Sequence, residues 1–291
     1  MRLRVIDLET TGFEPPAAAV CEIGWCDLTA VAHNVDGVPT SWDVGQPYAS
    51  YVWPGHSVPP ETSAIHHIVD EDLHGAPLWS KAAEMVVNPK AMPGNPPVAL
   101  VAHNAKFEKQ FCTDDLTGGL PWICTYKCAL RIFPHAPGHS NGTLRYWLKP
   151  LGLDRATAAA SHRAGPDAYV TAFLLRALLA EASIEKLIAW SAEPALQIKC
   201  WIGKNRGQLW TEVDESFLWW VSARDFDEDV LFTVRHEIAR REAVRKAGES
   251  AFGLSSSAAA LNQSALALEA AAERQTAAPR AAAGAQDGIP F

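Results

Sequence analysis

The sequence predicts an α/β domain in which a mixed β-sheet is flanked by helices. Its first part holds short apolar runs rich in β-branched residues, bounded by turns that contain Gly, Pro and Asp. A later segment, from Ala164 to about Ala182, has the apolar periodicity of a helix, with Pro166 in the first turn, where proline is tolerated. Strands that precede helices in this way are typical of a layered α/β fold with carboxylates gathered at the strand ends.

The individual elements follow the chain in order. The expected strands are LRVIDLE at 3–9, AVCEIGWCDL at 19–28, YASYVWP at 48–54 and PVALVAHNA at 97–105. The first three predict an N-terminal meander. The fourth leads into AKFEKQFCTDDL, residues 105–116, where Phe107 and Phe111 share a helix face at i,i+4 spacing.

Changes in composition predict three regions. We expect residues 1–188 to form the α/β domain and residues 189–243 to form a small tryptophan-rich module with a GKxRG turn. Its tryptophans are interpreted as a small core rather than as stacking platforms for bases. Residues 244–291 read as an Ala-rich, partly helical or disordered tail that ends in DGIPF.

Composition also limits the class of protein. The chain has 291 residues, 48% of them hydrophobic, but no apolar run that could span a membrane, and we expect a cytoplasmic monomer. Its six cysteines form no CxxC pair, so a disulfide framework is not expected. Cys124, Cys128, His135 and His139 could hold zinc, but their spacing is shorter than in zinc fingers, and this interpretation is not favoured.

Three segments carry the residues suited to metal chemistry. Asp7 and Glu9 lie two apart on an apolar strand, so both carboxylates project from one face and can bind a divalent cation. Glu108 comes one helical turn after the end of a strand. His162 precedes Asp167 by five residues, which places a titratable base in a loop and a carboxylate at the start of a helix.

Together, VIDLETTG, HNAKFEKQF and SHRAGPDAY resemble the three motifs of the DEDDh family of 3′→5′ exonucleases. The resemblance implies a ribonuclease H-like five-stranded sheet and a two-metal mechanism. It assigns Asp7, Glu9 and Asp167 as ligands of two Mg²⁺ or Mn²⁺ ions, Glu108 as a further candidate metal-binding and catalytic carboxylate, and His162 as the general base. The family has aspartate where this chain has Glu108, which keeps the charge, alters the geometry and leaves Asp114 or Asp115 as compensating carboxylates.

The same resemblance gives candidates for substrate binding. Leu8, Thr10 and Asn104 match positions that contact the terminal nucleotide. Phe13 could stack on a base, although capping the core is the preferred interpretation. Further candidates beside these motifs are Gly12, His66 and Phe107.

The expected activity is removal of nucleoside monophosphates from DNA 3′ ends, single-stranded or duplex, in repair, recombination or replication. Two alternatives stay open. One is an RNA-trimming or proofreading exonuclease of the same fold, and the other is a noncatalytic DNA-binding adaptor in which Glu108 marks a decayed site. The terminal residues Asp287 to Phe291 resemble the acidic, hydrophobic tip of bacterial single-stranded DNA-binding proteins and could dock on replication and repair proteins.

Overall fold

A computed structural model describes residues 1–92 and 94–253 of the chain. Its centre is a five-stranded sheet with the order β3-β2-β1-β4-β5. The strands are β1 (Arg2–Thr10), β2 (Val20–His33), β3 (Pro39–Tyr51), β4 (Ala99–Ala102) and β5 (Trp122–Cys124). β1 pairs antiparallel with β2 and parallel with β4, so the sheet is mixed. The predicted α/β fold with a mixed five-stranded sheet is confirmed.

The third strand is longer than the sequence predicts. β3 begins at Pro39, whereas the pattern indicated a strand only from Tyr48. The segment from Pro39 to Pro47 is largely polar, carries two prolines and a glycine, and is exposed or half-buried throughout, so it lacks the usual strand signals. Pairing with β2 along most of its length imposes the extended conformation.

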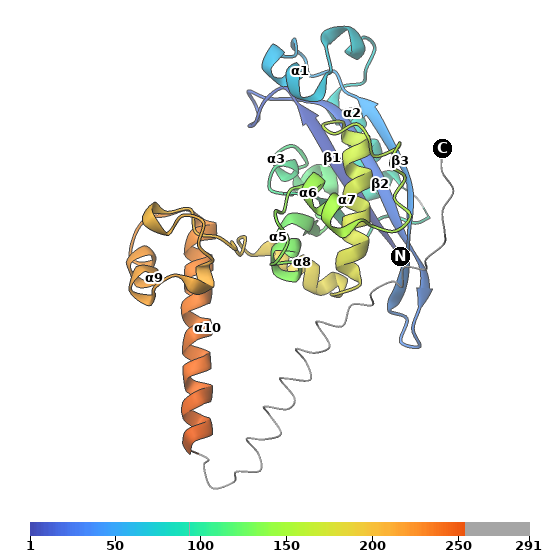
Figure 1. Cartoon of the computed structure of the whole chain (residues 1–291). Coiled ribbons are helices and arrows are strands. Elements are labelled where there is room, and N and C mark those ends of the chain that lie inside the picture. Colours follow the sequence, from blue (N-terminus) through green and yellow to red (C-terminus); the bar gives the residue numbers. More distant parts are fainter. Residues whose placement is uncertain (93, 254–291) are drawn as a thin grey trace, which may run out of the picture. The chain divides into compact units, whose positions relative to one another are not determined.

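Helices lie between β3 and β4, between β4 and β5, and after β5 (Figure 1). They are α1 (Pro60–His66), α2 (Trp79–Val87), α3 (Glu108–Phe111), α4 (Asp114–Thr117), α5 (Thr125–Ile132), α6 (Asn141–Leu148), α7 (Ala164–Leu179), α8 (Ile184–Ala192), α9 (Glu215–Ser222) and α10 (Glu228–Gly253). Short 3₁₀ turns are η1 (Asp70–Leu73), η2 (Pro89–Ala91), η3 (Gly203–Asn205) and η4 (Trp210–Glu212). None of the described helices is both long and apolar enough to cross a lipid bilayer.

The single helix expected at residues 105–116 is wrong. The structure has two short helices, α3 and α4, because Thr113 between them adopts an extended conformation with φ −65° and ψ 160°. The shared face of Phe107 and Phe111 survives, and their ring centroids lie 5.4 Å apart. The break separates Glu108, on α3, from the acidic residues of α4.

Two apolar clusters fill the two faces of the sheet. Leu3 and Val5 of β1 belong to the cluster that includes the apolar face of α7, and Ile6 and Leu8 belong to the cluster that includes α2. This assignment follows the two-residue alternation of side chains along a strand. Asp7 therefore continues the α7 face of β1.

Helix α7 lies directly on the sheet across β1, β2 and β3 (Figure 1). A Cβ atom added at Gly24 of β2 would lie 2.0 Å from the carbonyl carbon of Ala164, at the start of α7. Only glycine at this point lets the helix backbone come so close. Because Gly24 pairs with Asp7 in the sheet, the first turn of α7 is brought next to Asp7.

The chain divides into two compact units after Arg235. In the first unit, the tryptophan-rich segment contains η3, η4 and α9, and its Trp210 is buried with 2% exposure. Trp201, Trp219 and Trp220 are 49%, 50% and 42% exposed, so the interpretation of all four as core is wrong for these three. The expected boundaries at 188 and 243 stay predictions, and the DGIPF tip lies outside the described residues.

Candidate active site

Three carboxylates converge at one end of the sheet. Asp7, Glu9 and Asp167 each offer one oxygen, and these oxygens all lie within 4.8 Å of one another. In the described part of the chain, this is the one group of three or more acidic, histidine or cysteine side chains close enough to hold a metal ion. β1 supplies two of the carboxylates from one face, and the first turn of α7 supplies the third.

The cluster is electrostatically unfavourable without a cation. Burial, followed by the charges of Glu9, Glu108 and other acids, holds the pKa of Asp7 well above its usual range. Burial and the charge of Asp167 raise the pKa of Glu9 to about 8. Burial also raises the pKa of Asp167. Like charges held together in a poorly hydrated site favour either protonation or a bound divalent cation.

Glu108 lies beside this cluster but outside its tightest group. Its side chain is 3% exposed, and its Oε2 is buried with no hydrogen-bond partner among the described residues. Burial raises its pKa to about 8, with a further contribution from the charge of Glu9. An orphaned carboxylate oxygen next to three other carboxylates fits a site that receives a divalent ion or its hydration shell.

The loop before α7 presents His162 to solvent. Its backbone has a φ of 58°, in the left-handed region that few residues other than glycine adopt. The backbone N–H of His162 donates to Oδ2 of Asp167 over 2.7 Å. This bond ties the strained loop to the carboxylate of the helix, so the imidazole is held near the cluster while its ring stays exposed.

An ion pair between the buried Glu22 and the half-buried Arg163, which the sequence motifs did not reveal, fixes the same loop. Glu22 of β2 is 2% exposed and accepts two bonds from Arg163, Nη2 to Oε1 at 2.6 Å and Nε to Oε2 at 3.1 Å. It also accepts the N–H of Ala164 at 2.9 Å, and Arg163 reaches the hydroxyl of Tyr51 at 3.1 Å. Bidentate geometry fixes direction as well as distance, so this network sets where α7 begins.

The pair could have been suspected from the sequence only in part. Glu22 interrupts an apolar strand and Arg163 follows His162, yet 141 positions separate the two residues. A buried carboxylate on an apolar strand needs a cationic partner, but the sequence does not say which one.

Among the candidate substrate-binding residues, several surround the turn after β1. Leu8 and Thr10 are buried with 5% and 8% exposure, and the Thr10 hydroxyl donates to the carbonyl of Gly12 over 2.6 Å. Asn104 lies exposed with a φ of 71°, just before α3, and Phe107 is partly buried.

Phe13 and His66 differ from their expected environments. Phe13 is 83% exposed, so the preferred interpretation that it caps the core is wrong. His66 is 2% exposed; its Nδ1 accepts the N–H of Ile68, and its Nε2 lies 3.8 Å from Sγ of Cys21. Direct contact of His66 with a substrate would require this packing to open, and its role stays a prediction.

The structure does not bring together the other proposed metal ligands. Asp114 and Asp115 lie exposed on α4, away from the tight carboxylate group. Cys128 donates to the carbonyl of Leu187, and Nε2 of His139 contacts the carbonyl of Phe133 at 2.9 Å. These residues therefore have structural contacts of their own instead of a shared ion.

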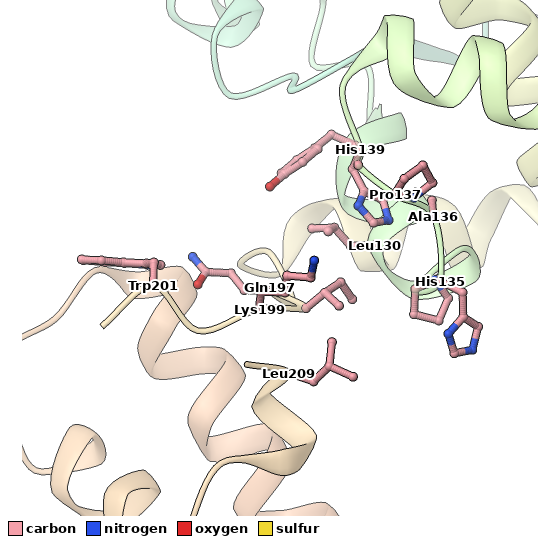
Figure 2. A pocket seen from close by; sticks show the side chains of 13 residues that line it. Leu130, His135, Ala136, Pro137, His139, Gln197, Lys199, Trp201 and Leu209 are labelled. Atoms are coloured by element: carbon pink, nitrogen blue, oxygen red, sulfur yellow. The ribbon is translucent and has the colours of Figure 1, made fainter. Parts of the chain in front are cut away.

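A cavity of about 540 Å³ lies apart from the carboxylates (Figure 2). Figure 2 shows Gln197, Lys199, Trp201 and Leu209 opposite the loop that carries His135 to His139. None of the candidate catalytic residues lines it. It is therefore not part of the site described above.

Several known proteins are similar to this chain. DNA polymerase III subunit epsilon of Treponema pallidum (strain Nichols) is 29% identical over 187 residues, which cover 60% of this chain and 74% of that protein. A structure of exonuclease X in complex with 5′-overhanging duplex DNA is 26% identical, with a TM-score of 0.48, over 65% of this chain and 99% of the other. Exonuclease I of E. coli in complex with a dT13 oligonucleotide is 14% identical, with a TM-score of 0.44, over 65% of this chain and 43% of the other.

The family assignment rests on a separate match. The family model described as Exonuclease, RNase_T, matches residues 5–175, which include Asp7, Glu9, Glu108, His162 and Asp167. Enzymes of this fold use divalent metal ions, and the donor set found here fits them. The chain belongs to the RNase_T exonuclease family, with its ribonuclease H-like fold, and is a nuclease.

Proposed function

We propose that this protein is a 3′→5′ exonuclease that releases nucleoside monophosphates from DNA 3′ ends in DNA repair, recombination or replication. The observation that carries the proposal is the convergence of Asp7, Glu9 and Asp167 within 4.8 Å in a chain of the exonuclease family. Similarity to a DNA polymerase III subunit supports DNA as the substrate. The expectations of a monomer and of a cytoplasmic location stay predictions.

In this proposal, Asp7, Glu9 and Asp167 hold two Mg²⁺ or Mn²⁺ ions, and Glu108 supports them from its buried position. When bound, the ions lower the pKa of the attacking water and offset the charge that develops on the leaving 3′ oxygen. His162 takes the proton from that water as general base, from an exposed loop held by its bond to Asp167.

The remaining residues hold the terminal nucleotide. The Thr10 hydroxyl fixes the turn at Gly12, from which Phe13 projects into solvent. An exposed ring in that place can stack on a base of any sequence, worth about 1–3 kcal/mol. Leu8 lies between Asp7 and Glu9 on β1, and Asn104 follows β4, the strand that pairs in parallel with β1.

The direct test is degradation of short oligonucleotides labelled at the 5′ or the 3′ end, as single strands and blunt duplexes, in Mg²⁺, Mn²⁺ or EDTA. We expect metal-dependent stepwise shortening from the 3′ end that Asp7→Asn abolishes and His162→Ala strongly reduces. Asp43→Asn, which neutralises an exposed carboxylate of β3, is the matched control and should behave as wild type.

Other outcomes separate the alternatives. Faster shortening of a matched RNA strand would show that RNA is the preferred substrate and favour the RNA-trimming alternative. A folded wild type that binds DNA but shortens neither strand with either metal would contradict the proposal and favour the adaptor interpretation, with Glu108 as the broken ligand.

A further inference from the structure

A basic pocket lies on α6 and the loop that follows it. It has a volume of about 420 Å³ and is lined by Arg145, Tyr146, Lys149, Pro150, Leu153 and Arg155. Three of these six side chains are cationic and none is acidic. The chain as a whole carries a net charge of −8, so this pocket is a local excess of positive charge on an acidic protein.

Helix α6 connects the pocket to the carboxylate cluster. At its start, Nδ2 of Asn141 donates to the backbone carbonyl of Asp167 over 3.2 Å and to the Thr171 hydroxyl over 3.1 Å. Arg145 follows one helical turn later, about 5–6 Å along the same face. Lys149 caps the C-terminal end of the helix.

The pocket has both a fixed and an open part. The Arg145 guanidinium donates to the carbonyl of Ala158 and lies 5.0 Å from the ring centroid of Tyr146, whose side chain is 66% exposed. Lys149 and Arg155 are exposed, and neither makes an ion pair within the described part of the chain. The neighbouring acid, Asp154, accepts the N–H of Thr157 at 2.6 Å and does not line the pocket.

Three other cations near the motifs are already engaged. Lys127 donates to the carbonyls of Ser191 and Glu193, Arg131 pairs with the Glu193 carboxylate, and Arg163 pairs with Glu22. Lys106 and Lys109, beside Glu108 in the chain, are exposed as well, but neither lines the pocket at the end of α6.

We propose that this pocket binds the phosphodiester backbone of the strand being degraded, upstream of its terminal nucleotide, with Tyr146 against a base. The inference rests on the proposed function, because it assigns the occupant as the substrate of the same site. Lys149 and Arg155 contact phosphates, and Arg145 keeps the loop open beside them. Backbone contacts of this kind position a strand without reading its sequence.

The test is the salt dependence of binding of a labelled single-stranded dodecamer in EDTA, measured by fluorescence anisotropy. Each phosphate contact that is lost reduces the slope of log K against log salt by about 0.7 for a single strand, so Lys149→Ala/Arg155→Ala should reduce it by about 1.4. Affinity at low salt should fall roughly 10-fold. Lys81→Ala/Lys90→Ala removes the same charge from exposed positions on α2 and η2 and should leave the slope unchanged.

A kinetic comparison complements the binding experiment. With Mg²⁺, the double variant should lower the ratio of kcat/KM for the dodecamer to kcat/KM for a chromogenic ester of thymidine 5′-monophosphate. If the double variant loses its native circular dichroism spectrum, Arg155→Ala alone should still reduce the slope by about 0.7.

The outcomes separate this inference from the proposed function. If the double variant keeps the wild-type salt slope while the wild type shortens DNA, the proposed role of the pocket is contradicted and the exonuclease proposal still stands. If the double variant has a reduced slope but the wild type shortens no strand, the role of the pocket in DNA binding is supported and the exonuclease proposal is contradicted. An equal loss of slope in the Lys81/Lys90 control would also overturn the pocket, because net charge alone would then explain the effect.

Discussion

Two glutamates that face each other in the sheet have opposite environments. Glu9 of β1 pairs with Glu22 of β2 in the strand register. Both carboxylate oxygens of Glu22 accept hydrogen bonds, from the Arg163 guanidinium and from the N–H of Ala164. Glu9 and its neighbour Asp7 have no side-chain hydrogen bond within the described part of the chain, and their pKa values are raised. The difference distinguishes a carboxylate that builds the fold from carboxylates kept open for a ligand.

This comparison also explains how the site is assembled. Glu22 and Arg163 lock the start of α7 onto β2, where Gly24 leaves room for the helix backbone. The locked helix then carries Asp167 to Asp7 and Glu9. The fully paired carboxylate therefore determines the geometry of the unpaired ones.

The largest effect is expected from neutralising each glutamate in turn. Glu9→Gln removes a proposed cation ligand and should reduce nuclease activity on the order of 10³-fold or more, without loss of metal-free stability. Glu22→Gln should reduce activity only about 10-fold, as for residues that orient ligands, and lower the free energy of unfolding by about 1–3 kcal/mol. Degradation of labelled DNA measures the activity of each variant, and urea unfolding in EDTA measures its free energy of unfolding. A larger activity loss in Glu22→Gln than in Glu9→Gln would contradict the distinction between a carboxylate that builds the fold and one that binds the cation.

Removing the cation from the paired carboxylate should mainly affect stability. Arg163→Ala leaves the charge of Glu22 buried and uncompensated, and we expect the free energy of unfolding to fall by about 3 kcal/mol. The control is Arg235→Ala, an exposed arginine of α10. A double-mutant cycle with Glu22→Gln should show strong coupling. Additive losses would mean that the two side chains do not act as a pair.

Adding one methyl group at the contact between sheet and helix should displace the third carboxylate. Gly24→Ala would place Cβ 2.0 Å from the carbonyl carbon of Ala164, so the first turn of α7 must move. We expect about 1–3 kcal/mol of destabilisation, together with weaker binding of Mn²⁺. Gly142→Ala on α6, where nothing lies within 4 Å, is the matched control. Wild-type Mn²⁺ affinity in Gly24→Ala would contradict the proposed assembly of the site.

The smallest effect concerns pH. The pKa values of Glu9 and Glu108 are raised from 4.5 to about 8 in the metal-free fold. The unfolded chain releases these protons near pH 4.5 and the folded chain retains them, so metal-free stability should fall as pH rises from about 4.5 to 8. Mg²⁺, which binds ionised carboxylates, should therefore raise the Tm more at about pH 8 than at about pH 5.

Glu108→Gln sharpens this prediction. It removes one of the two raised groups, and the metal-free Tm should depend less on pH between about 4.5 and 8. Differential scanning calorimetry in EDTA measures this dependence. An unchanged pH profile would show that Glu108 is not held protonated in the fold.

The sequence could predict what depends on local spacing. The two-residue alternation of β1 places Asp7 and Glu9 on one face, and the start of α7 was expected at Ala164, where the structure has it. The break after Phe111 was missed because Thr113 and the acidic residues that follow it are compatible with a helix, and only tertiary packing selects the extended conformation. The exposure of Phe13 depends on the path of a turn, which apolarity alone does not determine.

Long-range pairs were less accessible to sequence reasoning. The partnership of Glu22 with Arg163 and the basic pocket at the end of α6 require knowledge of which distant segments meet. Both become visible only when α6, α7 and the sheet are placed together.

The most direct test of the central claim is Mn²⁺ binding measured by isothermal titration calorimetry on wild type, Asp7→Asn and Asp43→Asn. If the unpaired carboxylates form the cation site, Asp7→Asn should lose most of the binding, whereas Asp43→Asn, at an exposed position of β3, should retain it. Wild-type Mn²⁺ affinity in a folded Asp7→Asn variant would contradict the claim.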